Sequence, residues 1–176
     1  GAIGTNDDAL AKRARLQRNY GSEQKYYHGI QGVSARLGRL QADFLRVKLR
    51  RALDPWNERR ELIAAQYTKR LAGITNLLVP TVPRWAKPVW HLYVVRLARR
   101  DALQRVLSDA GVGTLIHYPV PPHLSGAYVD GSWSRGAFPI AEGLAATVLS
   151  LPMGPHLSTE QAVYVAGEAN RAVQAL

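Results

Sequence analysis

The sequence predicts an α/β protein whose second half is a small α+β domain. Apolar residues recur at helical spacing through the first part of the chain, which indicates long helices as far as about residue 73. The segment VWHLYVVR at 89–96 is rich in β-branched and aromatic residues and predicts a strand. Helical and strand patterns alternate after it, as expected of a layered domain of mixed structure.

The start of the chain is predicted to hold a short strand, a helix and a long loop. GAIGT at 1–5 has the pattern of a strand end, and Asn6 is a candidate N-cap followed by two aspartates that suit the helix dipole. Gly21 is the expected stop of this helix, and a polar, glycine-rich loop follows over 21–34. A single short strand has no sheet to join, which indicates a piece of a larger fold.

Two long helices with a bend between them are expected next. The first covers 35–53, and its apolar positions recur at helical spacing: Leu37, Leu40, Phe44 and Val47. Asp54 and Pro55 have the pattern of an N-cap and a first helical residue, so a second helix is expected from there to Gly73. The remaining elements are expected to be strands at 77–79, 89–96 and 114–118, a helix from Asp101 to Ala110, a helix at 138–149, and a last helix opened by Ser158 with Gln161 in a capping box.

Composition narrows the function classes. The formal net charge of +10 suggests anionic partners, namely nucleic acid, phosphorylated small molecules or a membrane surface, although its dense part lies in a helical pattern and favours a solvated helix face. The absence of cysteine excludes disulfides and thiolate sites, and the five histidines lack zinc-site spacing, so we expect no metal. No apolar run approaches a membrane span and no signal peptide is visible, so we expect a cytoplasmic protein without a membrane partner.

The loop segment KYYH at 25–28 is one candidate for binding chemistry. Lys25, Tyr26, Tyr27 and His28 offer one charge and several hydrogen-bond donors, a set that suits a diphosphate and sugar hydroxyls. An ordinary polar loop whose tyrosines pack on a neighbouring element explains the same pattern equally well.

The stretch HYPVPPH at 117–123 is a second candidate. His117 and Tyr118 end an apolar segment, where their side chains can reach a cleft, and the prolines that follow stiffen the backbone. A stiff structural turn is the alternative interpretation.

The chain resembles the C-terminal part of the sugar aminotransferases of the DegT/DnrJ/EryC1/StrS family. The resemblance rests on six stretches that follow the family's order over nearly the whole chain: GAIGTNDDALAKRARLQRNYGS, KYYH, RLGRLQADFLRVKLR, WNERRELIA, GTLIHYPVPPH and LSLPMGPHLS. It implies the aspartate aminotransferase fold, which is fold type I, with pyridoxal phosphate as cofactor. KYYH and the helix after it are most similar to the branch that aminates C3 of a dTDP-linked 3-keto-6-deoxyhexose.

The resemblance implies ping-pong transamination, in which a lysine holds the cofactor as a Schiff base and moves protons while an amino donor, usually glutamate, supplies the amine for the keto-sugar. In the family this lysine lies shortly before the stretch that matches GAI. None of the chain's own lysines matches it: Lys12, Lys25, Lys48, Lys69 and Lys87. We therefore assign no catalytic residue, expect no pyridoxal phosphate to be bound by the chain alone, and leave open whether it is an enzyme.

The resemblance also assigns binding roles. The KYYH loop would face the nucleotide diphosphate and hexose in the partner subunit's active site, with Lys25 on phosphate, the other three residues on substrate, and His117 and Tyr118 at the border of the cleft. Family members have an asparagine that reaches the cofactor phosphate of the other subunit, and here that position is Ser34. Serine offers one donor where asparagine offers two, which weakens the expectation of cofactor binding at Ser34.

These resemblances divide the chain into three parts. Residues 1–34 would be the tail of the cofactor-binding large domain with the substrate loop, 35–73 long connecting helices, and 74–176 the small α+β domain. The expected function is that of the C-terminal fragment of a nucleotide-sugar aminotransferase, inactive alone, whose partner is a second copy or a complementing N-terminal chain. The alternatives are a non-catalytic remnant or interaction module and, ranked last because no nucleic-acid motif is present, a basic nucleic-acid-binding protein.

Overall fold

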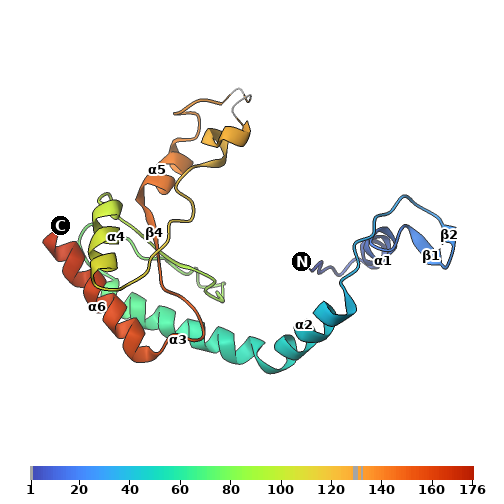
Figure 1. Ribbon diagram of the computed structural model, residues 1–176, viewed down its shortest axis with the longest axis horizontal. Coiled ribbons are helices and arrows are strands. Elements are labelled where there is room, and N and C mark those ends of the chain that lie inside the picture. Colours follow the sequence, from blue (N-terminus) through green and yellow to red (C-terminus); the bar gives the residue numbers. More distant parts are fainter. Residues whose placement is uncertain (1, 129–130, 132) are drawn as a thin grey trace. The chain divides into compact units, whose positions relative to one another are not determined.

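The computed structural model describes residues 2–128, 131 and 133–176. The chain divides into two compact units, residues up to Ala52 and Leu53–Leu176, and each is described by itself (Figure 1).

The first unit begins with helix α1, Asp8–Gln17, which is capped one residue later than expected. The side chain of Asp7 accepts hydrogen bonds from the backbone N–H groups of Ala9 and Leu10, so the prediction of Asn6 as N-cap was wrong. The prediction of a strand at 1–5 also fails, because residues 2–5 are not in a strand. A strand needs a neighbour for its backbone groups, and the described part of this unit provides none beside residues 2–5.

The segment predicted as a loop forms a small antiparallel hairpin of β1, Ser22–Gln24, and β2, Tyr27–His28. Its base lies tightly on the end of α1. Gly21 donates its backbone N–H to Leu16 at 2.8 Å, and Val33 donates to Gln17 at 2.7 Å. Gly21 has a φ of +71°, and a Cβ on Gly32 would lie 2.1 Å from the Gly21 nitrogen, so the close approach of these two segments requires glycine.

Helices α2, Arg39–Arg51, and α3, Leu53–Leu71, are separate, as the proline pattern predicts. Asp54 and Pro55 lie within the first turn of α3, so Asp54 is not the cap itself. None of the residues of α1 or α2 is buried, whereas α3 buries the side chains of Ile63, Tyr67 and Leu71. The hydrophobic core therefore lies in the second unit.

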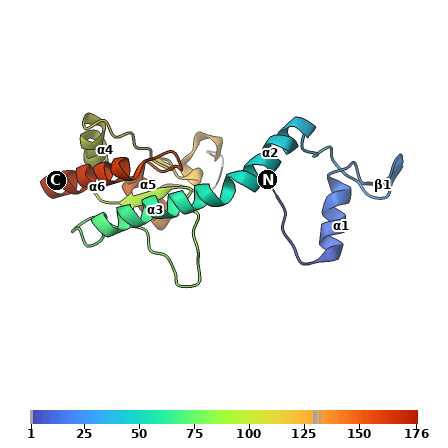
Figure 2. The same ribbon diagram turned by 90° about the horizontal axis from the view of Figure 1, so that it is seen from below.

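That core forms where α3 packs against α6, Thr159–Ala175, and against two paired strands (Figures 1 and 2). The buried side of α6 consists mainly of small residues, which let the two helices approach closely: Ala162, Val165, Ala166, Ala169 and Ala172. Ser158 and Gln161 form the predicted capping box at the start of α6.

The strands β3, Tyr93–Arg96, and β4, Val148–Leu151, are antiparallel. The prediction of a helix over 138–149 was wrong at its end, since helix α5 covers Pro139–Thr147 and β4 follows it directly. All four residues of β4 are buried, and a short apolar run of this kind cannot be separated from a buried helix segment by periodicity.

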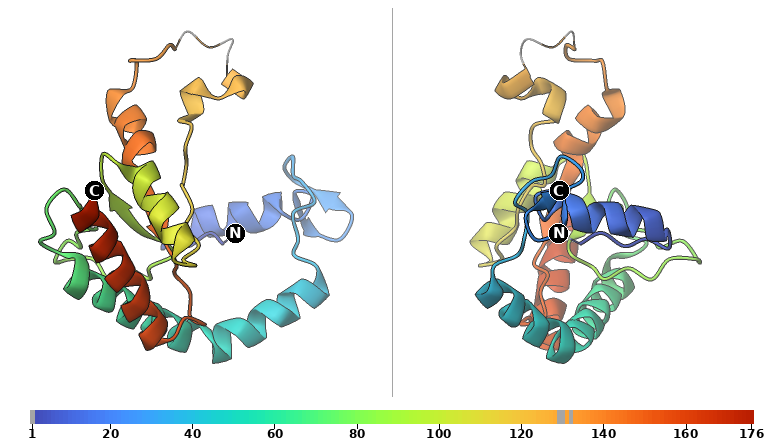
Figure 3. Two further views of the ribbon diagram at one scale, coloured as in Figure 1. Left: turned by 60° about the vertical axis from the view of Figure 1, so that its left-hand side comes forward. Right: turned by 90° about the vertical axis from the view of Figure 1, so that its right-hand side faces the viewer.

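Two predicted strands are reduced to single bridges. Leu78 bridges Arg96 of β3, and Leu115 bridges Ser150 of β4. The segment after Leu115 continues through the short 3-10 turns η1, Pro122–Leu124, and η2, Gly126–Tyr128, toward α5. Helix α4, Arg100–Asp109, lies beside α6, as both views of Figure 3 show.

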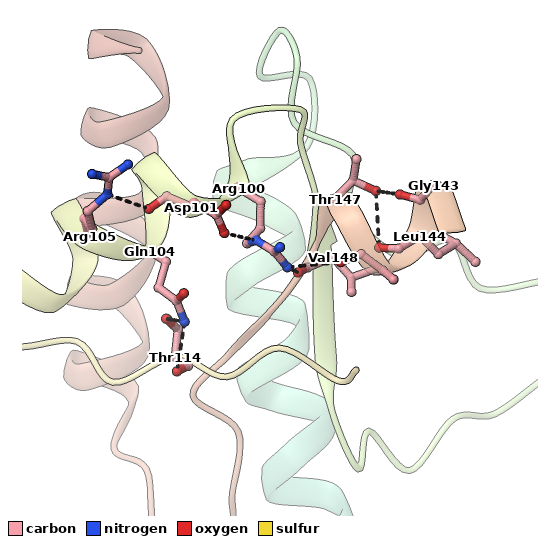
Figure 4. A network of polar contacts seen from close by, with 10 residues as sticks. Arg100, Asp101, Gln104, Arg105, Thr114, Gly143, Leu144, Thr147 and Val148 are labelled. Atoms are coloured by element: carbon pink, nitrogen blue, oxygen red, sulfur yellow. Dashed lines mark hydrogen bonds and ion pairs between the residues drawn. The ribbon is translucent and has the colours of Figure 1, made fainter. Parts of the chain in front are cut away.

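Arg100 connects α4 to the junction of α5 and β4 (Figure 4). Its buried guanidinium donates to the backbone carbonyls of Ala145 at 3.3 Å and Val148 at 3.0 Å, and it pairs with Asp101. The sequence predicts Asp101 as the N-cap of α4. In the structure the N-cap is Arg99, and Asp101 lies in the first turn of the helix. The three contacts hold the start of β4 in place against α4.

Replacing Arg100 by methionine is expected to lower the free energy of unfolding by about 2–4 kcal/mol, because two buried carbonyls lose a charged donor. Urea unfolding measures the change. Arg105→Met is the control, because Arg105 donates to an exposed carbonyl of the same helix, and it is expected to shift stability by about 0.5 kcal/mol or less. Equal stability of the two variants would show that Arg100 does not hold the junction.

Candidate functional site

Three of the four KYYH side chains surround the tip of the β1–β2 hairpin. Tyr26 and Tyr27 are 80% and 71% exposed, and the ammonium group of Lys25 lies 5.0 Å from the Tyr26 ring centroid. The hairpin thus presents a cation and two phenols away from its own unit. Both interpretations of the KYYH segment, a binding loop and tyrosines that pack on a neighbouring element, stay predictions.

His28 and Ser34 meet at a residue that the sequence reasoning passed over, Tyr20. The Nδ1 of His28 lies 2.9 Å from the carbonyl oxygen of Tyr20, and Ser34 Oγ donates to the Tyr20 hydroxyl at 2.7 Å. The Arg36 guanidinium lies 5.4 Å from the Tyr20 ring centroid. These contacts hold the two ends of the hairpin together and fix the orientation of the His28 ring.

The contact with the Tyr20 carbonyl defines what His28 offers to a ligand. A carbonyl oxygen only accepts hydrogen bonds, so Nδ1 of His28 must carry the hydrogen. In the neutral ring the other nitrogen, Nε2, is then an acceptor. His28 is therefore suited to receive a hydrogen bond, such as one from a sugar hydroxyl.

The hydrogen bond from Ser34 holds the pKa of the Tyr20 hydroxyl below its usual range, and Arg36 adds to this effect. The serine hydroxyl is directed at Tyr20 in this structure. Binding of a cofactor phosphate by Ser34 stays a prediction of the resemblance.

A basic hollow of about 670 Å³ lies next to the hairpin on α1. Its cations are Lys12, Arg15, Arg18 and Arg36, and only Lys12 among them pairs with an acid within the described residues, Glu23 at 2.8 Å. The first 52 residues hold eleven Lys and Arg against four Asp and Glu, so most of the chain's net charge lies in this unit. The hollow suits an anion, and the recurrence of cations every third residue along α1 is the sequence signal that could have revealed it.

In the second unit, His117 is anchored from β4. Its Nδ1 lies 2.9 Å from Oγ of Ser150, a buried residue, and its ring meets the Tyr118 ring edge to face at 5.6 Å. Tyr118 is 74% exposed. His117 is thus half-buried and Tyr118 is exposed. The sequence alone did not reveal Ser150 as the partner of His117.

The second histidine of HYPVPPH, His123, has a structural environment. Its Nε2 lies 3.0 Å from Glu142 Oε1, which also accepts the backbone N–H of Gly136 at 2.8 Å. The Gly136 hydrogen bond and then the one from His123 keep the pKa of Glu142 below its usual range. A cavity of about 300 Å³ adjoins this pair, lined by Pro122, His123, Tyr128, Trp133, Phe138 and Ala141.

No group of three or more His, Cys, Asp or Glu side chains that could hold a metal occurs among residues 2–128, 131 and 133–176. Within the same residues, no helix has the length and apolar character needed to cross a membrane.

Residues 1–169 match the model of the DegT/DnrJ/EryC1/StrS aminotransferase family. The chain belongs to this family. The match confirms the resemblance seen in the six stretches and the expected aminotransferase fold. Aminotransferases of the family are pyridoxal phosphate enzymes.

Three relatives indicate where the chain stands in the family. It is 56% identical over 94% of its length to the erythromycin biosynthesis sensory transduction protein EryC1 of Saccharopolyspora erythraea, covering 45% of that protein. It is 48% identical over 94% of its length to the dTDP-3-amino-3,4,6-trideoxy-alpha-D-glucose transaminase of Streptomyces venezuelae, covering 43% of it. The crystal structure of S. venezuelae DesV in complex with a ketimine intermediate matches with a TM-score of 0.90 at 46% identity, over 97% of this chain and 46% of that one.

The chain thus spans less than half the length of the relatives that it matches.

Replacing Ser34 by alanine is expected to raise the pKa of Tyr20, because the strongest contact that favours the phenolate is lost. The ultraviolet absorbance of tyrosinate measures this during a pH titration, with Tyr20→Phe identifying the residue's share of the signal. Ser22→Ala is the matched control, because the Ser22 hydroxyl donates to Gln24 and not to Tyr20. An identical titration of Tyr20 in the parent and Ser34→Ala chains would contradict the arrangement.

Proposed function

We propose that this chain provides the substrate-binding side of a nucleotide-sugar aminotransferase and that the catalytic lysine of that enzyme lies outside these 176 residues. The observation that supports the proposal is the exposed KYYH hairpin, which is held on α1 and Tyr20. The S. venezuelae relative is named as a transaminase of a dTDP-linked amino sugar. This name supports a dTDP-linked keto-hexose as the substrate class.

In this proposal the hairpin binds the nucleotide diphosphate and the hexose. Lys25 neutralises phosphate charge, and Tyr26 and Tyr27 donate hydrogen bonds from exposed hydroxyls. His28 accepts a hydrogen bond from a sugar hydroxyl through Nε2, since its Nδ1 hydrogen is held by Tyr20. His117 and Tyr118, in the second unit, are proposed to border a substrate cleft, as the resemblance implies.

When bound, pyridoxal phosphate carries the amino group from the donor, for which glutamate is the proposed substrate, to the keto-sugar. The chain's own residues bind and orient the sugar for that transfer and hold no proton of the reacting carbon. Ser34 stays the proposed contact of this chain with the cofactor phosphate, and its hydroxyl is directed at Tyr20 in this structure. The division into residues 1–34, 35–73 and 74–176 stays part of this proposal.

The surface of α2 supports a partner. Leu40, Phe44 and Val47 form one exposed apolar stripe, and Leu45 and Leu49 lie on a second one around the helix. Leu40 and Phe44 are 69% and 61% exposed. A helix with two apolar stripes is expected to pack between two surfaces, so we propose that the complementing N-terminal polypeptide covers one stripe and a second copy of the assembly the other.

The test mixes the chain with the N-terminal part of the S. venezuelae relative that it does not match, and follows amination of a dTDP-keto-hexose. Turnover is expected only in the mixture. An assembled complex without turnover would overturn the proposed function and favour the interaction module.

Lys25→Ala is expected to raise KM for the nucleotide sugar by about tenfold or more in that mixture, because one charged hydrogen bond to phosphate is lost. The half-reaction with the amino donor is expected to be unchanged, since the donor carries no phosphate. Lys69→Ala, on the exposed side of α3, is the matched control. Equal losses in both half-reactions would contradict the assignment of Lys25 to the nucleotide.

A further inference from the structure

Ser150 is a buried hydroxyl in an otherwise apolar strand. It is 4% exposed, and the other three residues of β4 are Val148, Leu149 and Leu151. Its backbone N–H donates to Leu115 at 2.8 Å, and its carbonyl accepts from Leu115 at 3.2 Å. This backbone pairing fixes the position of the Ser150 hydroxyl. His117 follows Leu115 by two residues.

The proton between Ser150 and His117 can be assigned by counting donors. If Nδ1 of His117 carried the hydrogen and donated it to Ser150, the serine hydroxyl hydrogen would have no acceptor among the described residues. A buried donor without an acceptor costs about 1–3 kcal/mol. If Ser150 donates to Nδ1, the buried hydroxyl hydrogen is used, and the hydrogen left without a partner among the described residues is the one on Nε2 of the half-buried ring.

We propose that Ser150 is a positioning residue that fixes His117 in the tautomer with its hydrogen on Nε2, so that His117 donates a hydrogen bond to an oxygen of the substrate. Nε2 has no hydrogen-bond partner within the described residues, and the ring is only half-buried. The inference rests on the proposed function, because it names what His117 does in the nucleotide-sugar site.

His117 and His28 then have opposite roles. His28 gives its Nδ1 hydrogen to the Tyr20 carbonyl and accepts through Nε2, whereas His117 receives at Nδ1 and donates through Nε2. The ligand that fits His117 is an oxygen with a free lone pair, such as a carbonyl, ring or phosphate oxygen. His117 in this state is not a general base, since its outer nitrogen already carries a hydrogen.

The first test uses the chain alone, labelled with ¹⁵N in its histidines, at about pH 9 where imidazoles are neutral. The His117 resonances, identified with a His117→Gln chain, are expected to show the Nε2–H tautomer, and those of His28 the Nδ1–H tautomer in the same spectrum. Ser150→Ala is expected to move His117 toward a mixture of both tautomers, and Ser150→Thr to restore it.

The Nδ1–H tautomer at His117 in the parent chain would overturn the inference, and so would a Ser150→Ala spectrum identical to the parent one. If Ser150→Ala unfolds, the parent and Ser150→Thr chains decide the question alone. None of these results depends on turnover, so they are separate from the outcome of the proposed function.

The second test compares His117→Gln with His117→Glu in the mixture that contains the N-terminal polypeptide. Glutamine keeps a donor near the position of Nε2 and glutamate does not, so we expect KM for the nucleotide sugar to rise about tenfold more in the glutamate variant. Inhibition by dTDP separates two sources of the oxygen. A loss of dTDP affinity in His117→Glu assigns the contact to phosphate, an unchanged affinity assigns it to the sugar, and equal KM in both variants would overturn the donor role.

Discussion

The packing of α3 on α6 and on the β3–β4 pair supports everything that the second unit presents. Tyr67 lies at its centre, 5.0 Å from the Tyr93 ring, and donates its hydroxyl to the Pro152 carbonyl at 2.7 Å. Burial raises the pKa of both tyrosines. This core fixes β4, and through Ser150 it fixes His117. The first unit has no comparable core, and its hairpin geometry depends on backbone hydrogen bonds to α1 and on the contacts of Tyr20.

The side chains proposed for substrate binding are on this chain, whereas no catalytic residue is assigned to it. The described side chains include a cation, exposed phenols and two imidazoles whose Nδ1 atoms are held by hydrogen bonds, and the proposed function assigns these groups to binding a sugar nucleotide. Exposed apolar stripes on α2 and the basic hollow on α1 are further surfaces of the chain, which spans less than half the length of the relatives that it matches.

The sequence predicted the family, the existence of a break between α2 and α3, and the capping box of α6, although the break lies at Ala52, ahead of Asp54 and Pro55. It failed at β4, since four consecutive buried residues have no periodicity that separates strand from helix. It also overlooked Tyr20 and Ser150. Tyr20 contacts Ser34, fourteen residues away, and Ser150 contacts His117, thirty-three residues away. Contacts between residues so far apart have no signature in a single sequence.

The most direct measurement of the central claim is the location of the lysine that holds the cofactor. The chain is mixed with the N-terminal polypeptide and pyridoxal phosphate, reduced with borohydride, digested and mapped by mass spectrometry for the pyridoxyl group. The account predicts the label on a lysine of the N-terminal polypeptide and none on the five lysines of this chain. A label on one of them that depends on the mixture and blocks amination would show that the chain carries the catalytic lysine itself and would contradict the account.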